Sequence, residues 1–329
     1  MTPRISICIP AYRQVEFLRE TLVSVREQTF QSYEVVITDD SPNGEVEELV
    51  GSYLSDSRWR YRRNTVPLGS PENWNEAIRL SSAPLVKLLH HDDKFAGPEA
   101  LGRFVAMMDD NPAAHFGFAS CVVIDVRTGR TSINRPSAAQ VGALCRSPAT
   151  IFAANIVGAP SVTIYRRSVG LDYDAAMTWL VDVDFYYRII RRHPEVVFSI
   201  QPLILTVKNA EHQVTEQVRA DPLVDIGEHL RLFEKLDPAE KQLPAIATAW
   251  RRLFYRYDIH SEAQLADRYS FSVSTAGYLQ ALLGGSFRNR TRVALGRLVY
   301  RTYMLLPPSA QAQVRAARGL LTRVKARAQ

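Results

Sequence analysis

The sequence predicts an α/β fold in which a Rossmann-like, mostly parallel mixed sheet carries helices on both faces and is followed by a C-terminal helical region. Three observations predict it. Apolar runs typical of strands alternate with helical apolar spacing over the first hundred residues, and two of these runs end in paired carboxylates. From about residue 218 onward the apolar spacing is helical throughout. Strand–helix alternation favours a sheet that is buried on both faces.

The N-terminal part of the chain alternates between strand and helix. Apolar runs that match strands lie at 4–11, 33–41, 58–64 and 84–90. Helical spacing separates them at 14–29, 45–55 and 70–82. Ser70 is expected to cap the third helix, with Pro71 at its first position, where the missing N–H costs nothing.

The following part is less regular. It predicts helices at 98–110, 147–157 and 182–193, and strands at 115–125, 160–167 and 196–207. The C-terminal part predicts helices at 220–236, 238–256, 262–283, 289–306 and 308–327. The helix at 182–193 opens with carboxylates, which the positive end of its dipole favours.

Composition indicates an ordinary globular protein. The chain has 329 residues, of which 46% are hydrophobic and 22% charged. Its three cysteines, Cys8, Cys121 and Cys145, are widely spaced, which favours core positions in a reducing compartment over a disulfide framework or a metal cluster. No apolar run approaches the ~18 residues of a membrane span. Because a strand begins almost at the N-terminus, we expect no signal peptide and a cytoplasmic protein.

The charge is distributed unevenly. Residues 268–329 contain eleven Arg or Lys and no Asp or Glu, although the net charge of the whole chain is only +6. A basic segment on a slightly acidic body favours a local anionic partner. Aromatic residues are not interleaved with these basic residues as base-stacking platforms, so nucleic acid is not the expected partner.

Paired carboxylates follow two of the predicted strands. Asp39-Asp40 and Asp92-Asp93 both stand at carboxyl ends of strands, where open α/β sheets bind their ligands, so we expect them in one cleft. Like charges this close need a positive group between them, most often a divalent metal that also holds a phosphate. The alternatives are that Asp39 caps the following turn and that the second pair caps the helix at 98. His90 and His91 are expected to be neighbours of the ion rather than its ligands.

Two common nucleotide-binding motifs are missing from the sequence. There is no G-x-G-x-x-G after the first strand and no G-x-x-x-x-G-K-[ST] anywhere. A dinucleotide-binding dehydrogenase and a P-loop enzyme are therefore both disfavoured.

Four segments, in this order along the chain, resemble family 2 glycosyltransferases of the GT-A fold. They are "ISICIPAYRQVEFLRETLVSVREQTFQSYEVVITDDS", "NWNEAIRLSSAPLVKLLHHDD", "PSVTIYRRS" with "YDAAMTWLVDVDFYYRI", and "PLILTVKNAEHQVT". The resemblance covers roughly residues 4 to 216. It implies a GT-A domain at 1–217, with a nucleotide-binding half at 1–96 and an acceptor half at 97–217, and a helical region with a basic tail at 218–329.

The resemblance also implies roles for individual residues. It places Pro10, Ala11 and Tyr12 beside the base and ribose, Asp40 on the pyrimidine N–H, Asp92 toward the ribose or sugar, Asp93 and His212 on the metal, and Asp182 as catalytic base. The family's metal motif often reads Asp-x-Asp, and His91 takes its first place here. For the base, Asp184 is the alternative, while Asp182 could merely start its helix. His212 could bond only backbone, and Trp179 could be either a sugar-stacking platform or a core residue.

These assignments imply an inverting glycosyltransferase that uses Mn²⁺ or Mg²⁺ and a nucleotide-sugar donor, with a UDP-sugar preferred. Its acceptor is expected to be a glycan or a lipid-linked molecule in cell-surface polysaccharide synthesis. Asp182 is expected to have an ordinary pKa and to be ionised at neutral pH. The alternative function is a non-catalytic nucleotide-sugar-binding module, which would need Asp40 and Asp93 but not Asp182.

The basic tail suggests a membrane contact. Four apolar residues fall on one helical stripe: Val314, Ala317, Leu321 and Val324. Three basic residues lie beside it: Arg315, Arg318 and Lys325. Such a helix suits an anionic membrane surface, which would bring the protein to the inner face of the cell membrane. The alternative is that the helix docks on the acidic body of the protein.

Overall fold

The computed structural model describes residues 2–210, 218, 221–284, 302, 303, 305, 306, 310 and 311. The chain divides into two compact units at Leu236 and Asp237. Helix α8 (Pro222–Lys235) therefore lies in the first unit, whereas the boundary expected from the sequence, at 217/218, assigns it to the C-terminal region. Of the residues assigned to the site from the sequence, His212 lies outside the described ranges.

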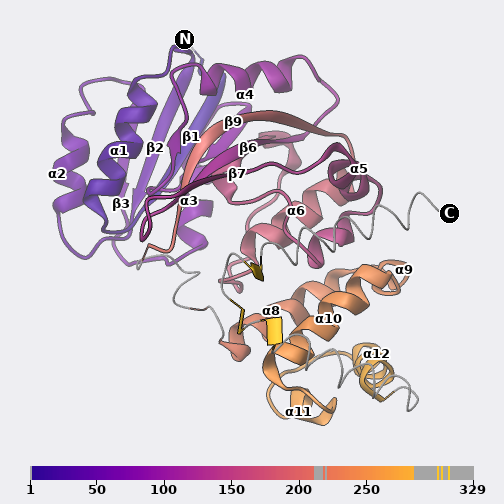
Figure 1. The fold of residues 1–329 in the computed structure, drawn as a ribbon. Coiled ribbons are helices and arrows are strands. Elements are labelled where there is room, and N and C mark those ends of the chain that lie inside the picture. Colours follow the sequence, from indigo (N-terminus) through magenta and orange to yellow (C-terminus); the bar gives the residue numbers. More distant parts are fainter. Residues whose placement is uncertain are drawn as a thin grey trace. The chain divides into compact units, whose positions relative to one another are not determined.

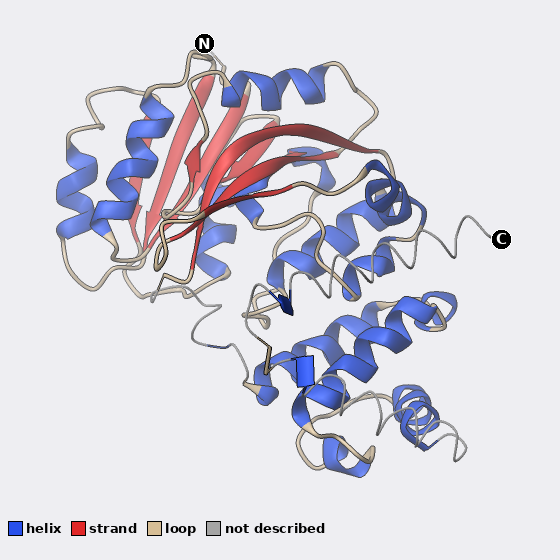
Figure 2. Ribbon diagram, viewed as in Figure 1, coloured by secondary structure: helices blue, strands red, loops and turns tan. Residues whose placement is uncertain are grey.

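The first unit is built on a mixed sheet with the strand order β3-β2-β1-β4-β8-β6-β9-β5, and β7 pairs with β6 beside this path. The strands are β1 (Ile5–Ala11), β2 (Tyr33–Asp39), β3 (Trp59–Arg63), β4 (Leu85–Leu88), β5 (Lys94–Phe95), β6 (Phe116–Asp125), β7 (Thr131–Asn134), β8 (Thr163–Arg166) and β9 (Val196–Lys208). Figure 2 shows how strongly the longer strands of this sheet bend. The arrangement confirms the expected mixed α/β architecture.

The four strands β3, β2, β1 and β4 are parallel to one another, so the loops that follow them lie at the same edge of the sheet. Ile5 pairs with Tyr33 on one side and with Leu85 on the other, and Ala11 pairs with Asp39. All residues of β1 and β2 are buried, which explains why both strands are mostly apolar. The carboxyl ends of these strands therefore meet at one edge of the sheet, as parallel pairing requires.

Helices cover this sheet (Figure 1). In the first unit they are α1 (Val15–Arg26), α2 (Glu45–Gly51), α3 (Glu72–Leu80), α4 (Ala100–Asp109), α5 (Ala138–Arg146), α6 (Val181–Arg192) and α8. Three 3₁₀ turns lie between α5 and α6, two of them on either side of β8: η1 (Pro148–Phe152), η2 (Pro160–Val162) and η3 (Arg167–Val169). Helix α3 contacts β1, β2 and β4, while α4 contacts β6 and β9. Apolar side chains buried by these contacts form the core of the unit.

The second unit is helical within its described residues. It contains α9 (Pro238–Lys241), α10 (Pro244–Tyr257), α11 (Ala263–Ala266) and α12 (Val273–Gly284). Two long helices expected from the sequence, at 238–256 and 262–283, are thus each divided, the first of them at Pro244, which occupies the first turn of α10. The expected helices at 289–306 and 308–327 lie mostly outside the described residues. None of the helices within the described ranges is long and apolar enough to cross a membrane.

Other local expectations were wrong. Residues 147–157 were expected to form an α-helix, but only a 3₁₀ turn forms there, and the helix, α5, precedes it. Ser137 and Gln140 cap α5 through a reciprocal capping box. Ser70 does not cap α3, because the helix begins at Glu72 and Pro71 is its N-cap residue.

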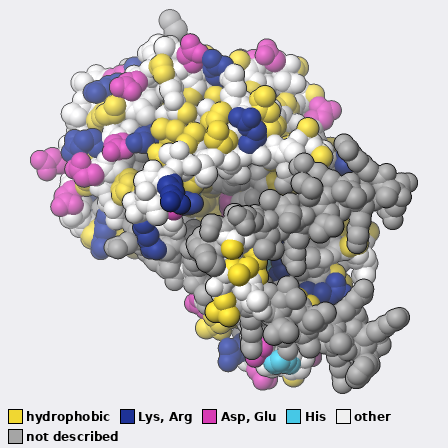
Figure 3. All heavy atoms as spheres, in the orientation of Figure 1, with side chains coloured by type: hydrophobic (Ala, Val, Ile, Leu, Met, Phe, Trp, Pro, Cys, Tyr) yellow, Lys and Arg dark blue, Asp and Glu magenta, His cyan; other side chains and the backbone are white. Residues whose placement is uncertain are grey.

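On the face drawn in Figure 3, acidic and basic side chains of the first unit are interspersed.

Candidate active site

Three side chains after β4 form a candidate cation site. Ligand atoms of His90, Asp92 and Asp93 lie within 4.8 Å of one another. The Asp93 N–H donates to the His90 carbonyl over 3.1 Å, which closes the turn that brings these side chains together. The ring nitrogen Nε2 of His90 is buried and has no hydrogen-bond partner in the described part of the chain. His90 was expected to be a neighbour of the ion, but it stands among the potential ligands.

The pKa of the Asp93 carboxyl group is strongly shifted. Burial and the adjacent Asp92 raise its pKa well above the usual range of a carboxyl group. A hydrogen bond from Ser161 and the positive charge of Lys87 act in the opposite direction. The Ser161 hydroxyl also accepts the His90 N–H over 2.9 Å, so one residue of η2 holds both ends of the turn.

Lys87 is a functional candidate that the sequence interpretation missed. It is fully buried in β4, donates to the Ser161 carbonyl and lies over the Phe104 ring at 4.5 Å. Burial lowers its pKa to about 7, although Asp93 opposes this shift. The signal was present in the sequence, because a lysine in the middle of a strand covered on both faces has to be buried. Part of the positive charge that the paired aspartates require is therefore supplied by the chain itself.

The chemistry of the donor set fits a divalent cation. Two carboxylates and one imidazole offer two oxygen ligands and one nitrogen ligand in a partly dehydrated corner. Carboxylate oxygen suits both Mg²⁺ and Mn²⁺, whereas imidazole nitrogen is a ligand that Mg²⁺ rarely takes. A buried imidazole nitrogen without a partner is what such a site needs. The three residues can therefore hold the metal that the sequence predicted.

The loop after β1 presents one exposed aromatic ring. Pro10 and Ala11 are buried, while the side chain of Tyr12 is 47% exposed. Arg13 and Gln14 have φ angles of 56° and 50°, in the left-handed region, so the chain turns sharply after Tyr12. The Arg13 guanidinium lies 5.0 Å from the centre of the Tyr12 ring. Backbone strain is tolerated here in order to leave an aromatic face and a cation at the strand edge.

Asp39 and Asp40 have separate roles. Asp39 accepts the Ser41 N–H and the Tyr61 hydroxyl, both over 2.8 Å, so it caps the turn, which was the alternative considered for it. Asp40 accepts hydrogen bonds from the loop at 64–69, over distances of 2.7 to 3.0 Å. Its donors are the Asn64 side chain and the backbone N–H groups of Leu68 and Gly69. A carboxylate has about four lone-pair positions, so Asp40 can accept one further donor.

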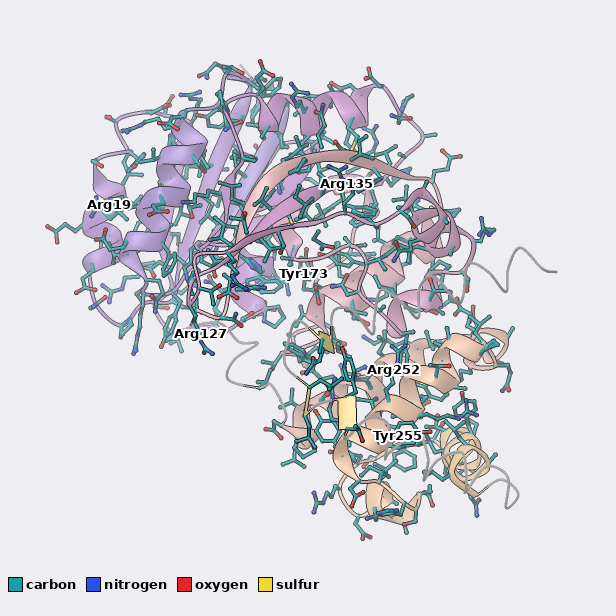
Figure 4. All side chains as sticks on the ribbon, viewed as in Figure 1. Arg19, Arg127, Arg135, Tyr173, Arg252 and Tyr255 are labelled. Atoms are coloured by element: carbon teal, nitrogen blue, oxygen red, sulfur yellow. The ribbon has the colours of Figure 1, made fainter. Side chains whose placement is uncertain are left out.

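The ring of Trp74 contacts both His90 in the candidate cation site and Tyr173. The ring centre of Trp74 lies 4.7 Å from that of His90 and 5.2 Å from that of Tyr173. Tyr173, labelled in Figure 4, is buried, and the negative charge of Asp182 contributes to raising the pKa of its hydroxyl. Trp74 itself is half-buried.

Asp182 stands in the first turn of α6. Its carboxylate accepts the Asn155 amide and the Val183 N–H, both over 2.8 Å. Burial, aided by the charge of Glu228, raises its pKa to about 7, against the stabilising effect of these hydrogen bonds. The expectation of an ordinary pKa was therefore wrong. Loss of solvation destabilises the ionised carboxylate more than its hydrogen bonds stabilise it.

Asp184 is placed for a structural role. Its carboxylate is fully buried and forms ion pairs with Arg188 at 2.7 Å and with Lys235 at 2.5 Å. Both of its oxygens thus have cationic partners. The donors to Asp182, two residues earlier, are an amide and a backbone N–H, both of them uncharged. Asp182 is therefore the better candidate for proton transfer.

Trp179 precedes α6 and is half-buried. Its backbone N–H donates to the carboxylate of Glu228 over 2.8 Å. Glu228 belongs to α8 and was not expected near the site, because the sequence-based boundary placed it in another region. No local pattern could have identified this pair, since the two residues are 49 positions apart.

Comparison with known proteins adds the family. Residues 6–169 match the model of Glycosyl transferase family 2. The chain belongs to glycosyltransferase family 2. The match includes β1, β2 and the turn with His90, Asp92 and Asp93, and it ends before α6.

Relatives of this glycosyltransferase are distant. It is 28% identical to protein MT1568 of Mycobacterium tuberculosis over 203 residues, which are 58% of this chain and 63% of the relative. The chain thus spans less than two thirds of the length of that curated relative.

Solved structures show the fold. Staphylococcus aureus TarS (residues 1–349), in a complex with UDP-GlcNAc, superposes with a TM-score of 0.59 and 19% identity over 76% of this chain and 72% of that chain. The mannosyltransferase PcManGT of Pyrobaculum calidifontis, in a complex with GDP-Man and Mn²⁺, gives 0.52 and 15% identity over 91% of this chain and 86% of that chain. The fold is that of GT-A glycosyltransferases.

Proposed function

We propose that this family 2 glycosyltransferase moves a sugar from a nucleoside diphosphate sugar, with UDP-sugars preferred, to a hydroxyl group in a single displacement that inverts the anomeric carbon. The observation that carries the proposal is that the Trp74 ring contacts both His90 and Tyr173, and that Asp182 is near enough to Tyr173 for its charge to raise the pKa of that hydroxyl. This arrangement connects a donor set suited to a cation and a diphosphate with a single carboxylate whose pKa is about 7. A base with a pKa near the working pH is well matched to proton transfer.

Asp182 acts as the base in this mechanism. Its carboxylate takes the proton of the acceptor hydroxyl while the hydroxyl oxygen bonds to the anomeric carbon, opposite the departing nucleoside diphosphate. Asp184 cannot share the role, because it is buried between Arg188 and Lys235. One base without a second nucleophile implies inversion, by analogy with the carboxylate pairs of inverting glycosidases. An α-linked donor would therefore give a β-linked product.

His90, Asp92 and Asp93 would hold Mn²⁺ or Mg²⁺. When bound, the ion offsets the negative charge that develops on the departing diphosphate. The chain prepares this corner through Ser161, which fixes the turn, and Lys87, whose charge partly balances that of Asp93. The sequence interpretation gave Asp92 to the ribose or sugar. We now assign it to the cation, because its carboxylate belongs to the ligand cluster.

The nucleotide would lie against the loop of Pro10, Ala11 and Tyr12. The exposed ring of Tyr12 offers a stacking face for a base, and Asp40 has capacity to accept a ring N–H. A pyrimidine with its N3–H group satisfies this acceptor, which supports UDP over GDP. The UDP-GlcNAc complex of TarS agrees with this choice, whereas the GDP-Man complex of PcManGT is the counterexample within the same fold.

The acceptor would lie beside Trp179, whose half-buried ring offers a face for a sugar. We propose a glycan or a lipid-linked acceptor, in cell-surface polysaccharide synthesis on the cytoplasmic side of the membrane. The basic tail, with eleven Arg or Lys between residues 268 and 329, supports a site of action close to anionic lipid.

A donor screen tests the function. UDP-, GDP- and dTDP-sugars are incubated with the protein and Mn²⁺ or Mg²⁺, and the release of nucleoside diphosphate is followed. We expect release from a UDP-sugar only when the metal is present. Calorimetry that shows tighter binding of GDP than of UDP would overturn the choice of nucleotide. A protein that binds UDP but consumes no donor would be the non-catalytic module considered above.

A further inference from the structure

The segment before α6 is held by a carboxylate from α8. Glu228 accepts the backbone N–H groups of Thr178 over 2.6 Å, of Trp179 over 2.8 Å and of Leu180 over 2.6 Å. One oxygen takes the first of these bonds, and the other takes the remaining two. The Glu228 side chain is buried, and three charge-assisted hydrogen bonds offset the cost of burying it.

The three donors lie in the segment that leads into α6, and the last of them is on the N-cap residue of the helix. Leu180 is the N-cap residue of α6, and its own side chain makes no capping hydrogen bond; one turn donor, the Val183 N–H, is accepted by Asp182. A carboxylate at this position also interacts favourably with the helix dipole. The start of α6 is thus capped by a residue 48 positions away, so its position depends on that of α8. Trp179 directly precedes Leu180, and Asp182 follows Leu180 by two residues, so both site residues are next to the clamped backbone.

Other contacts anchor α8 to the same part of the first unit. Arg231 and Lys235 bind Asp174 at 2.8 and 2.7 Å, and Lys235 also binds Asp184. The Tyr187 hydroxyl donates to the carbonyl of Lys235 over 3.3 Å. These contacts join α8 to the body without touching the backbone at 178–180. They therefore distinguish the general attachment of α8 from the specific clamp made by Glu228.

We propose that Glu228 is a positioning residue, whose carboxylate fixes the backbone at 178–180 and thereby sets Trp179 and Asp182 toward the acceptor. Helix α8 is then part of the acceptor site. This inference rests on the proposed function, since it presumes that Asp182 takes the acceptor's proton. A base displaced by about 1 Å loses much of its effect on the rate while donor binding at the strand edge is unaffected.

The test compares two variants of the full chain. Glu228→Gln keeps the size of the side chain but replaces one acceptor oxygen by an NH₂ group that faces backbone donors. Arg231→Gln is the matched control, because it loosens α8 through the contact with Asp174 and leaves the clamp intact. Two readouts are followed: hydrogen exchange of the amides at 178–180, and the steady-state kinetics of sugar transfer.

For Glu228→Gln we expect exchange at 178–180 to be at least about 10-fold faster and kcat to be at least about 10-fold lower, with the donor KM within twofold of wild type. Arg231→Gln should change neither exchange at 178–180 nor kcat. Glu228→Asp keeps the charge on a shorter side chain and should give intermediate values; it also serves if the glutamine variant does not fold.

Three results would contradict the proposal in different ways. Unchanged exchange at 178–180 in Glu228→Gln would remove the clamp. Faster exchange with a kcat equal to that of Arg231→Gln would make Glu228 merely structural and leave the proposed function intact. A wild-type protein that consumes no nucleotide sugar would overturn the proposed function, and the positioning role with it.

Discussion

The protonation of Asp182 predicts how the rate of sugar transfer depends on pH. Burial raises its pKa to about 7, and the carboxyl group can accept a proton only in its ionised form. We therefore expect kcat/KM for transfer to rise about tenfold per pH unit up to roughly pH 7 and to level off above it. A rate profile between pH 5 and 9 measures this. A rate that stays level down to pH 5 would mean that Asp182 is more solvated than its surroundings indicate, or that another group is the base.

Asp184 is expected to affect stability rather than chemistry. Replacing it by Asn leaves the charges of Arg188 and Lys235 without their buried partner. We expect Asp184→Asn to lower the free energy of unfolding by about 2–3 kcal/mol, less than for a fully buried pair, because both cations retain some contact with water. Denaturant titration measures the loss. If Asp184→Asn keeps its stability but loses transfer while Asp182→Asn transfers normally, the base is Asp184.

At the scale of elements, the turn after β4 makes a prediction about metal selectivity. His90→Phe keeps a ring against Trp74 but removes the nitrogen ligand. We expect it to weaken Mn²⁺ binding in the presence of UDP at least about 10-fold and Mg²⁺ binding much less, since imidazole favours Mn²⁺.

Calorimetry with each ion measures this effect, and His91→Phe is the matched control, because His91 is outside the ligand cluster. Equal losses for the two ions in His90→Phe, or equal losses in both variants, would contradict a direct ligand role for His90.

Elements with strong periodicity were predictable from the sequence. Strands β1 and β2 were identified because strands buried on both faces are mostly apolar, and α6 because its apolar spacing is helical. Helix α5 was missed because only Leu144 among its residues is buried, so it has little amphipathic pattern to detect. Strand β7 was missed for a similar reason, as all its residues are exposed.

The site was predictable where it follows the chain locally. The carboxylates at strand ends could be found because parallel pairing brings those ends to one edge. Lys87 was overlooked although its place within a buried strand indicated its burial, and Glu228 was missed because its partners lie far along the chain. The loop bonds that engage Asp40 could not be foreseen for the same reason.

At the scale of the whole molecule, the basic tail remains a prediction, because its apolar stripe at 314–324 lies outside the described residues. We expect the full chain to float with liposomes that contain anionic lipid at low salt and to be released as the salt concentration rises. Vesicles made only of neutral lipid are the control. A chain that ignores anionic vesicles would favour the alternative, in which the tail docks on the protein.

The central claim is that Asp182 and the cluster of His90, Asp92 and Asp93 together transfer a sugar. The most direct test measures Mn²⁺-dependent UDP release from UDP-sugars by wild type, Asp182→Asn and Asp93→Ala, with UDP binding measured in parallel. We expect Asp182→Asn to bind UDP normally and to react at least roughly 100-fold more slowly, and Asp93→Ala to lose the stimulation by metal. Full activity in Asp182→Asn, or stimulation by metal that persists in Asp93→Ala, would contradict the claim.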